Sequence, residues 1–173
     1  MKNFCSLAVG AAMLYFPYVW CYFRKESAEA YGLQWYADRQ SLRFTLLLTC
    51  AVLALLTPAA LLWPGVSLPF RRSGREVFNL LCAGLAAAVI EETFFRGFVQ
   101  TMFKRRFNLF FSVICVNVLF AASHLAAVRN YWLLATFFPG LVMSFLREKY
   151  GNILPSMIFH FLGNVWAVWF FPL

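Results

Sequence analysis

Apolar side chains fill long stretches of this chain, and short polar stretches separate them. The longer apolar runs approach or exceed the roughly 20 residues that a helix needs to cross the hydrocarbon core of a bilayer. Six membrane-spanning helices are therefore predicted, over residues 4–23, 44–63, 76–103, 108–126, 131–146 and 153–170. The linkers between the last four are short, so neighbouring helices of this group are expected to pack antiparallel.

Pro–Gly pairs and one polar segment interrupt this pattern. The pair at 64–65 should end the second helix, and the pair at 139–140 should kink the fifth helix or open its hydrogen-bond ladder. The segment 24–43 is polar and contains Trp35 and Tyr36, two aromatic types that favour the headgroup level of a membrane. It is predicted to form a short amphipathic piece at the interface.

Composition supports a membrane protein. Of the 173 residues, 62% are hydrophobic and 13% are charged, about half the charged share of a soluble domain. The net charge of +8 does not indicate nucleic-acid binding, because the basic residues lie at the ends of apolar runs, as they do beside membrane spans. We expect an all-α integral membrane protein, a bundle of about six transmembrane helices with an active site inside the bundle, and the lipid bilayer as its partner.

The third apolar run carries three charges, Glu91, Glu92 and Arg96. Each charge costs roughly 2.5–3.5 kcal/mol at the bilayer centre on insertion scales, so such groups need partners or a wet pocket. Glu92 and Arg96 are four residues apart with the acid first, the favourable order for an ion pair on a helix. Glu91 points about 100° away, which leaves its carboxylate for a pocket and suits a general base. Gly97 should let another helix approach closely.

The only two histidines, His124 and His160, also lie in apolar runs. Phe120 precedes His124 by four residues and can pack against its ring, while His160 and Asn164 share one helix face. An imidazole and an amide are donors that can stabilise an oxyanion. Each group also has a purely structural alternative, since polar pairs join helices in membranes. Their conjunction favours one shared functional pocket.

Three motifs follow one another on these helices: EETFFR at 91–96, FAASH at 120–124 and HFLGN at 160–164. This ordered set resembles the CAAX protease and bacteriocin-processing family, also called the type II CAAX prenyl endopeptidase or Abi family. The resemblance covers about residues 76–170. We therefore expect one membrane domain over residues 1–173, in which 1–75 forms two accessory spans and 76–170 the catalytic core.

The resemblance implies a glutamate-type intramembrane endopeptidase. Its substrate would be a membrane-associated protein or peptide, cleaved near its C-terminus or membrane anchor. By position, Glu91 would activate water with help from His124, while His160 and Asn164 would hold the oxyanion and the neighbouring ion pair would orient the site. The small size and the family analogy favour a multi-pass protein of the bacterial cell membrane that trims peptides or that processes C-terminal membrane-anchoring sorting signals of surface proteins.

No cofactor is expected. Glu91, His124 and His160 have side chains that can bind zinc, but the chain has no HExxH motif and asparagine is a poor zinc ligand, so a metal is disfavoured. Two other functions stay open. One is a non-catalytic membrane partner or immunity-type protein that uses the same polar groups for packing. The other is a small transporter, which the lack of a visible inverted repeat disfavours.

Overall fold

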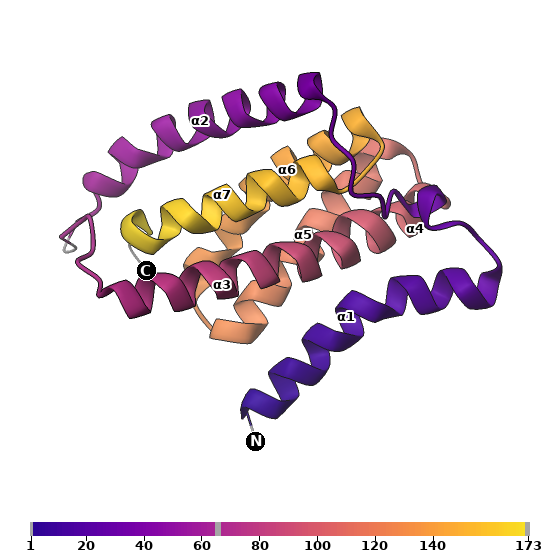
Figure 1. Ribbon diagram of the computed structural model, residues 1–173, viewed down its shortest axis with the longest axis horizontal. Coiled ribbons are helices and arrows are strands. Elements are labelled where there is room, and N and C mark those ends of the chain that lie inside the picture. The colour runs from indigo at the N-terminus through magenta and orange to yellow at the C-terminus, as the bar shows by residue number, and fades with distance from the viewer. Residues whose placement is uncertain (1, 65–66, 172–173) are drawn as a thin grey trace.

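The computed structural model describes residues 2–64 and 67–171, and every regular element within them is helical (Figure 1). This confirms the predicted all-α class. The main helices are α1 (Lys2–Arg24), α2 (Arg39–Leu61), α3 (Gly74–Glu91), α5 (Leu109–Val128), α6 (Phe137–Tyr150) and α7 (Leu154–Phe170). Helix α3 continues through a π-helical segment, η2 (Glu92–Val99), into α4 (Gln100–Lys104). Two 3₁₀ segments, η1 (Ala28–Tyr31) and η3 (Tyr131–Thr136), lie between helices.

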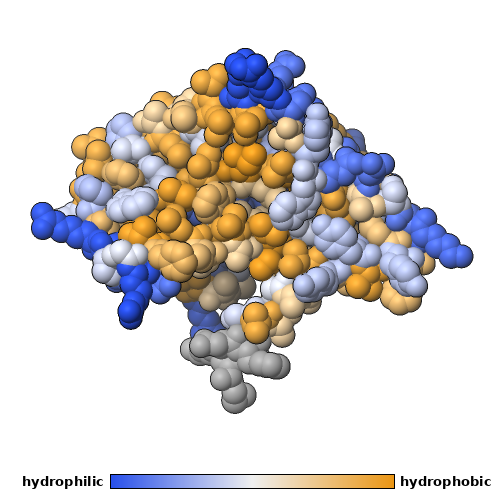
Figure 2. Space-filling view, in the orientation of Figure 1, coloured by the Kyte–Doolittle hydropathy of each residue, from blue (hydrophilic) through white to orange (hydrophobic). Residues whose placement is uncertain are grey.

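Within the described residues, four helices are long and apolar enough to cross a membrane: Ser6–Arg24, Arg39–Leu61, Gly74–Lys104 and Leu109–Val128. Helix α7 is apolar but shorter, and α6 has 14 residues. At most 28% of the residues in each spanning window are buried inside the protein, so most apolar side chains face outward, as a lipid-exposed surface requires. Figure 2 shows apolar residues over the middle of one face and hydrophilic residues toward its edges.

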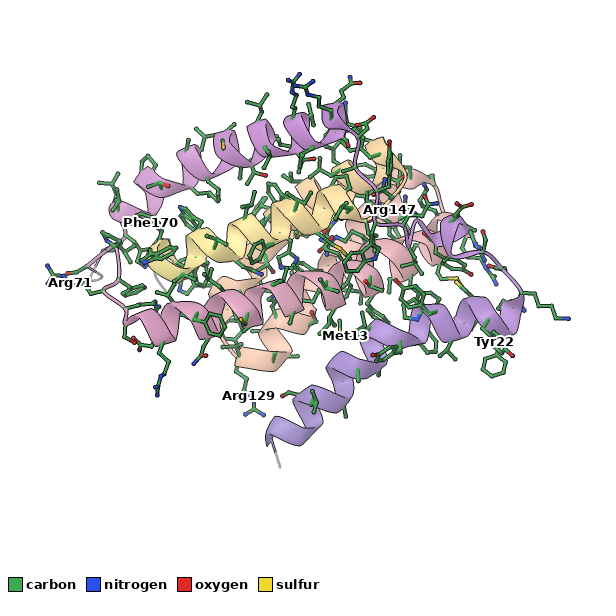
Figure 3. All side chains as sticks on the ribbon, in the orientation of Figure 1. Met13, Tyr22, Arg71, Arg129, Arg147 and Phe170 are labelled. Atoms are coloured by element: carbon green, nitrogen blue, oxygen red, sulfur yellow. The ribbon has the colours of Figure 1, made fainter. Side chains whose placement is uncertain are left out.

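Helix α7 is the centre of the bundle, because it packs against α2, α3 and α6. In Figure 1, α2, α7 and α3 lie side by side, and α5 and α6 lie behind them. Helix α1 diverges from this group but contacts α3 and η2. Figure 3 places Arg71 and Phe170 at one end of the molecule and Tyr22 and Arg147 at the other.

Side-chain caps explain where several helices begin. Ser73 and Glu76 form a capping box at the start of α3, Asp38 caps α2, and Asn108 caps α5. Each cap satisfies a backbone N–H that has no partner inside the helix. Because Asp38 caps the polar turn before the apolar run, α2 starts five residues earlier than predicted. It ends at Leu61, ahead of the pair at 64–65, of which Gly65 lies outside the described residues.

The segment 24–43 contains both exposed and buried side chains. Trp35 and Tyr36 are exposed, whereas Tyr31 and Leu33 are buried; the place of this segment at the membrane interface stays a prediction. Leu33 packs so closely on Gly97 that a Cβ there would overlap the leucine side chain. The predicted close approach at Gly97 is therefore made by the 3₁₀ segment and the residues after it, rather than by another helix.

The predicted single helix over 131–146 is wrong. Its first part forms η3, and α6 begins only at Phe137. Pro139 consequently lies in the first turn of α6, where its missing N–H would have had no helical partner. The Pro–Gly pair thus marks the beginning of a helix instead of kinking one.

Candidate active site

The acidic motif lies where the third helix changes its hydrogen bonding. Glu91 is the last residue of α3, and the eight residues Glu92–Val99 form the π-helix η2. The N–H of Gln100 donates to the carbonyl of Phe95, five residues before it. Six of the eight residues in η2 are buried. Short π segments occur frequently at functional sites, and this one carries the charged residues of the motif.

Glu92 and Arg96 form the predicted ion pair, and both side chains are fully buried. Arg96 Nη1 lies 3.2 Å from Glu92 Oε1. Arg96 Nη2 donates to Asn117 Oδ1 at 3.0 Å and to the Gly140 carbonyl at 3.2 Å. The guanidinium also lies 4.2 Å from the centre of the Phe120 ring, within the range of a cation–π contact. The charge of Glu92 is therefore balanced inside the protein.

Glu91 points toward both histidines. Its Oε2 lies 3.7 Å from His124 Nε2 and 3.8 Å from His160 Nε2. This oxygen is buried and makes no hydrogen bond within the described residues, although 23% of the side chain is exposed. The structure thus brings together three predicted site residues from α3, α5 and α7. They leave one carboxylate oxygen free for chemistry.

The other ring nitrogens of the histidines fix how the rings face Glu91. His124 Nδ1 lies 2.9 Å from the Phe120 carbonyl, and His160 Nδ1 lies 3.0 Å from Glu92 Oε1. A carbonyl oxygen only accepts a hydrogen bond, so Nδ1 of His124 carries the hydrogen. Whenever the ring is neutral, Nε2 is then an acceptor on the Glu91 side.

The Phe120 ring contacts three members of this cluster. It makes edge-type contacts with the rings of His124, at 4.5 Å between centroids, and His160, at 6.0 Å, besides its contact with Arg96. The packing on His124 was expected from their spacing. The contact with His160 joins two helices and could not be read from a local pattern. Phe120 therefore holds both imidazoles in place.

Asn164 contacts the backbone of α3. Its Nδ2 donates to the Gly84 carbonyl at 2.9 Å, and a Cβ on Gly84 would lie 3.0 Å from the Asn164 Cβ. One N–H of the amide is therefore engaged, and the second is available to another acceptor. Asn164 lies one turn beyond His160 on α7.

A buried polar group that sequence reasoning missed supports the arginine. Asn117 accepts from Arg96, and its Nδ2 donates to Ser144 Oγ at 2.9 Å and to the Val113 carbonyl at 2.8 Å. A Cβ on Gly140 would overlap Asn117 Oδ1, so only glycine fits beside this contact. An amide within an apolar run is the same kind of signal as the two histidines, and it could have identified Asn117.

Glu91, His124 and His160 are the residues that the sequence offers as metal ligands. Within the described part of the chain, no group of three or more His, Cys, Asp or Glu side chains has the arrangement to hold a metal ion.

These features define a multi-pass helical membrane protein with a buried acid–histidine cluster. Residues 73–166 match the family described as type II CAAX prenyl endopeptidase Rce1-like, and this match covers more than half of the chain. The protein belongs to this family, which is a family of proteases, and membership supports peptidase activity in the membrane. Comparisons with curated proteins and with solved structures gave no match.

Proposed function

We propose that this protein is a glutamate-dependent endopeptidase of the membrane. It cleaves a membrane-associated protein or peptide near its C-terminus or membrane anchor. The observation that supports this most is Glu91 Oε2, which makes no hydrogen bond within the described residues and lies 3.7 and 3.8 Å from the two imidazole Nε2 atoms. Glu92 is already balanced by Arg96, so Glu91 is the acid available for proton transfer.

The first step is the activation of water. At 3.7 Å, Glu91 Oε2 and His124 Nε2 are too far apart for a direct hydrogen bond. A bridging water suits two polar atoms at such a separation. Glu91 takes a proton from this water while its oxygen adds to the carbonyl carbon of the scissile peptide. A positioned general base of this kind contributes about 10²–10⁴-fold to a rate.

The second step is the stabilisation and collapse of the tetrahedral intermediate. His160, with a hydrogen on each ring nitrogen, donates from Nε2 on the Glu91 side, while its Nδ1 donates to Glu92 Oε1. The second N–H of Asn164 is the other donor to the oxyanion. Glu91 then gives its proton to the leaving amine nitrogen, the C–N bond breaks, and the carboxylate is restored.

The substrate class that we propose rests on family analogy. A compact peptidase of the bacterial cell membrane would process C-terminal sorting signals of surface proteins. A peptide with a short recognition motif, an apolar span and a basic tail is therefore the substrate to test first.

Substitution of Glu91 tests this proposal. In proteoliposomes with such a peptide, Glu91→Gln and His124→Ala should each lower cleavage by at least about 10²-fold while the melting curve stays close to that of the wild type. Glu76→Gln is the matched control, because it makes the same change near the start of α3 and glutamine can also complete a capping box. Full cleavage by Glu91→Gln would exclude the mechanism. Unfolding of Glu91→Gln would instead support the non-catalytic role.

A further inference from the structure

An open groove of about 380 Å³ lies between α3 and α7. On one wall are small side chains of α3, among them Ala83, Gly84 and Ala87. On the other wall are Asn164 and Val168 of α7. No part of the peptide chemistry described above uses this groove beyond Asn164.

The two walls continue the faces that carry the proposed active site. Ala87 precedes Glu91 by four residues on α3, and Asn164 follows His160 by four residues on α7. Residues at this spacing share a helix face. The groove therefore leads away from the site along both helices. From Ala87 to Leu80, the lining of α3 extends about 10 Å at 1.5 Å per residue, which is room for a short extended peptide.

Arg72 lies at the far end of this groove. Its Nε donates to the Val168 carbonyl at 2.6 Å, which fixes the guanidinium against the end of α7. Its two terminal nitrogens make no hydrogen bond or ion pair with any other residue that the structure describes. The nearby Glu76 carboxylate is bound by the N–H and hydroxyl of Ser73. Figure 3 shows Arg71, the neighbour of Arg72, at the same end as Phe170.

We propose that this groove binds the part of the substrate that follows the scissile bond, and that Arg72 binds its terminal carboxylate. This proposal rests on the peptidase function proposed above. A guanidinium binds a carboxylate through two parallel hydrogen bonds, and the two terminal nitrogens of Arg72 have no hydrogen-bond partner among the residues that the structure describes. The small α3 side chains leave space for the peptide. The enzyme would then recognise a free chain end a few residues beyond the scissile bond. Of the two proposed cleavage positions, near the C-terminus or near a membrane anchor, the groove favours the first, because a long apolar span after the scissile bond would not fit in about 10 Å.

A binding experiment with two forms of one peptide tests this. The probe is a fluorescent, N-palmitoylated octapeptide, prepared with a C-terminal carboxylate or a C-terminal amide. The full-length Glu91→Gln protein in phosphatidylcholine nanodiscs should bind the acid about tenfold more tightly than the amide, as expected for hydrogen bonds to a charged group. Adding Arg72→Gln should lower affinity for the acid to that for the amide. Arg71→Gln, one residue away and outside the groove lining, should keep the tenfold preference.

The proposal would be overturned if the protein with Arg72 intact bound the acid and the amide with equal affinity, or bound neither detectably. This comparison does not depend on how any Arg72 variant folds. The proposal would also be overturned if Arg71→Gln lowered the affinity for the acid as much as Arg72→Gln does. The effect would then come from the overall positive charge of this end of the molecule and not from a contact with Arg72. If Arg72→Gln changed binding only in phosphatidylglycerol nanodiscs, the ligand would be a lipid phosphate and the proposal would fail.

Cleavage by the wild type separates this proposal from the peptidase function. A preference for binding the acid, together with no cleavage of either form, would support the groove and count against the peptidase. Equal cleavage and equal binding of both forms would support the peptidase and overturn the role of Arg72.

Discussion

The buried pair of Glu92 and Arg96 gives a quantitative prediction. Arg96→Met keeps a long side chain with an apolar stem but removes the positive charge. It leaves the Glu92 carboxylate buried without its cation, and it removes the donor to Asn117 and Gly140. The variant therefore tests whether the pair holds the site together.

The magnitude follows from the geometry. With an effective dielectric constant of about 20, two charges at the 3.2 Å separation of Arg96 Nη1 and Glu92 Oε1 attract by about 5 kcal/mol. Removing the arginine also removes its own desolvation cost, so the net loss is smaller. Breaking one side of a buried pair typically costs about 3–5 kcal/mol. The double variant Glu92→Gln with Arg96→Met leaves no unpaired charge and should recover most of this loss.

Unfolding in dodecyl maltoside micelles with increasing sodium dodecyl sulfate, followed by circular dichroism, measures the difference. Arg105→Met is the control, because its ion pair with Glu26 is partly exposed to water and should contribute far less. A loss below about 1 kcal/mol for Arg96→Met, or a double variant no more stable than the single one, would refute the reasoning.

Three further predictions concern the same helices and the loop beside them. Asn117→Ala should lower the unfolding free energy by about 1–3 kcal/mol, because it leaves a buried guanidinium donor unpaired; an unchanged melting curve would contradict this. Gly140→Ala should cost about 1–3 kcal/mol, since its Cβ would overlap Asn117 Oδ1; unaltered micelle unfolding would count against it. Hydrogen bonds from Arg105 and then Tyr31 lower the pKa of Glu26. The stability that Glu26 contributes should be complete above pH about 4.3 and be lost as the pH falls through the lowered pKa. Acid titration of wild type and Glu26→Gln checks this, and parallel curves would disprove it.

Hydrophobic patterning predicted the main helices because the bilayer imposes a length and an apolar surface on each spanning helix. The same logic predicted that the polar groups in the apolar runs come together. Charges and imidazoles are costly in apolar runs, so Glu91, His124 and His160 were expected to meet, and their side chains do lie together. The Glu92–Arg96 contact followed from local spacing alone.

Features set by tertiary contacts or by small changes in helix geometry were not predictable. Tyr31 and Leu33 lie in a polar segment, and both are buried where this segment packs against Gly97, which has no Cβ. The pattern of apolar residues over 131–150 fits one continuous helix as well as it fits η3 followed by α6, so it could not predict the division. The contact of Asn164 with Gly84 joins residues 80 positions apart, which no local periodicity reports.

The π-helical segment has a consequence for how this protein tolerates insertions and deletions. A hydrogen-bond ladder of the i→i+5 type holds more residues per turn than an α-helix. Deleting one residue between Glu92 and Val99 would let the segment relax into regular α-helix. Because each π turn holds more residues than an α turn, removing one residue leaves about the same number of turns, and the helix on either side keeps nearly its present relative rotation. A single-residue deletion here should therefore disturb the neighbours of Glu91 and Gln100 less than the same deletion within α3, which would rotate all following residues by about 100°.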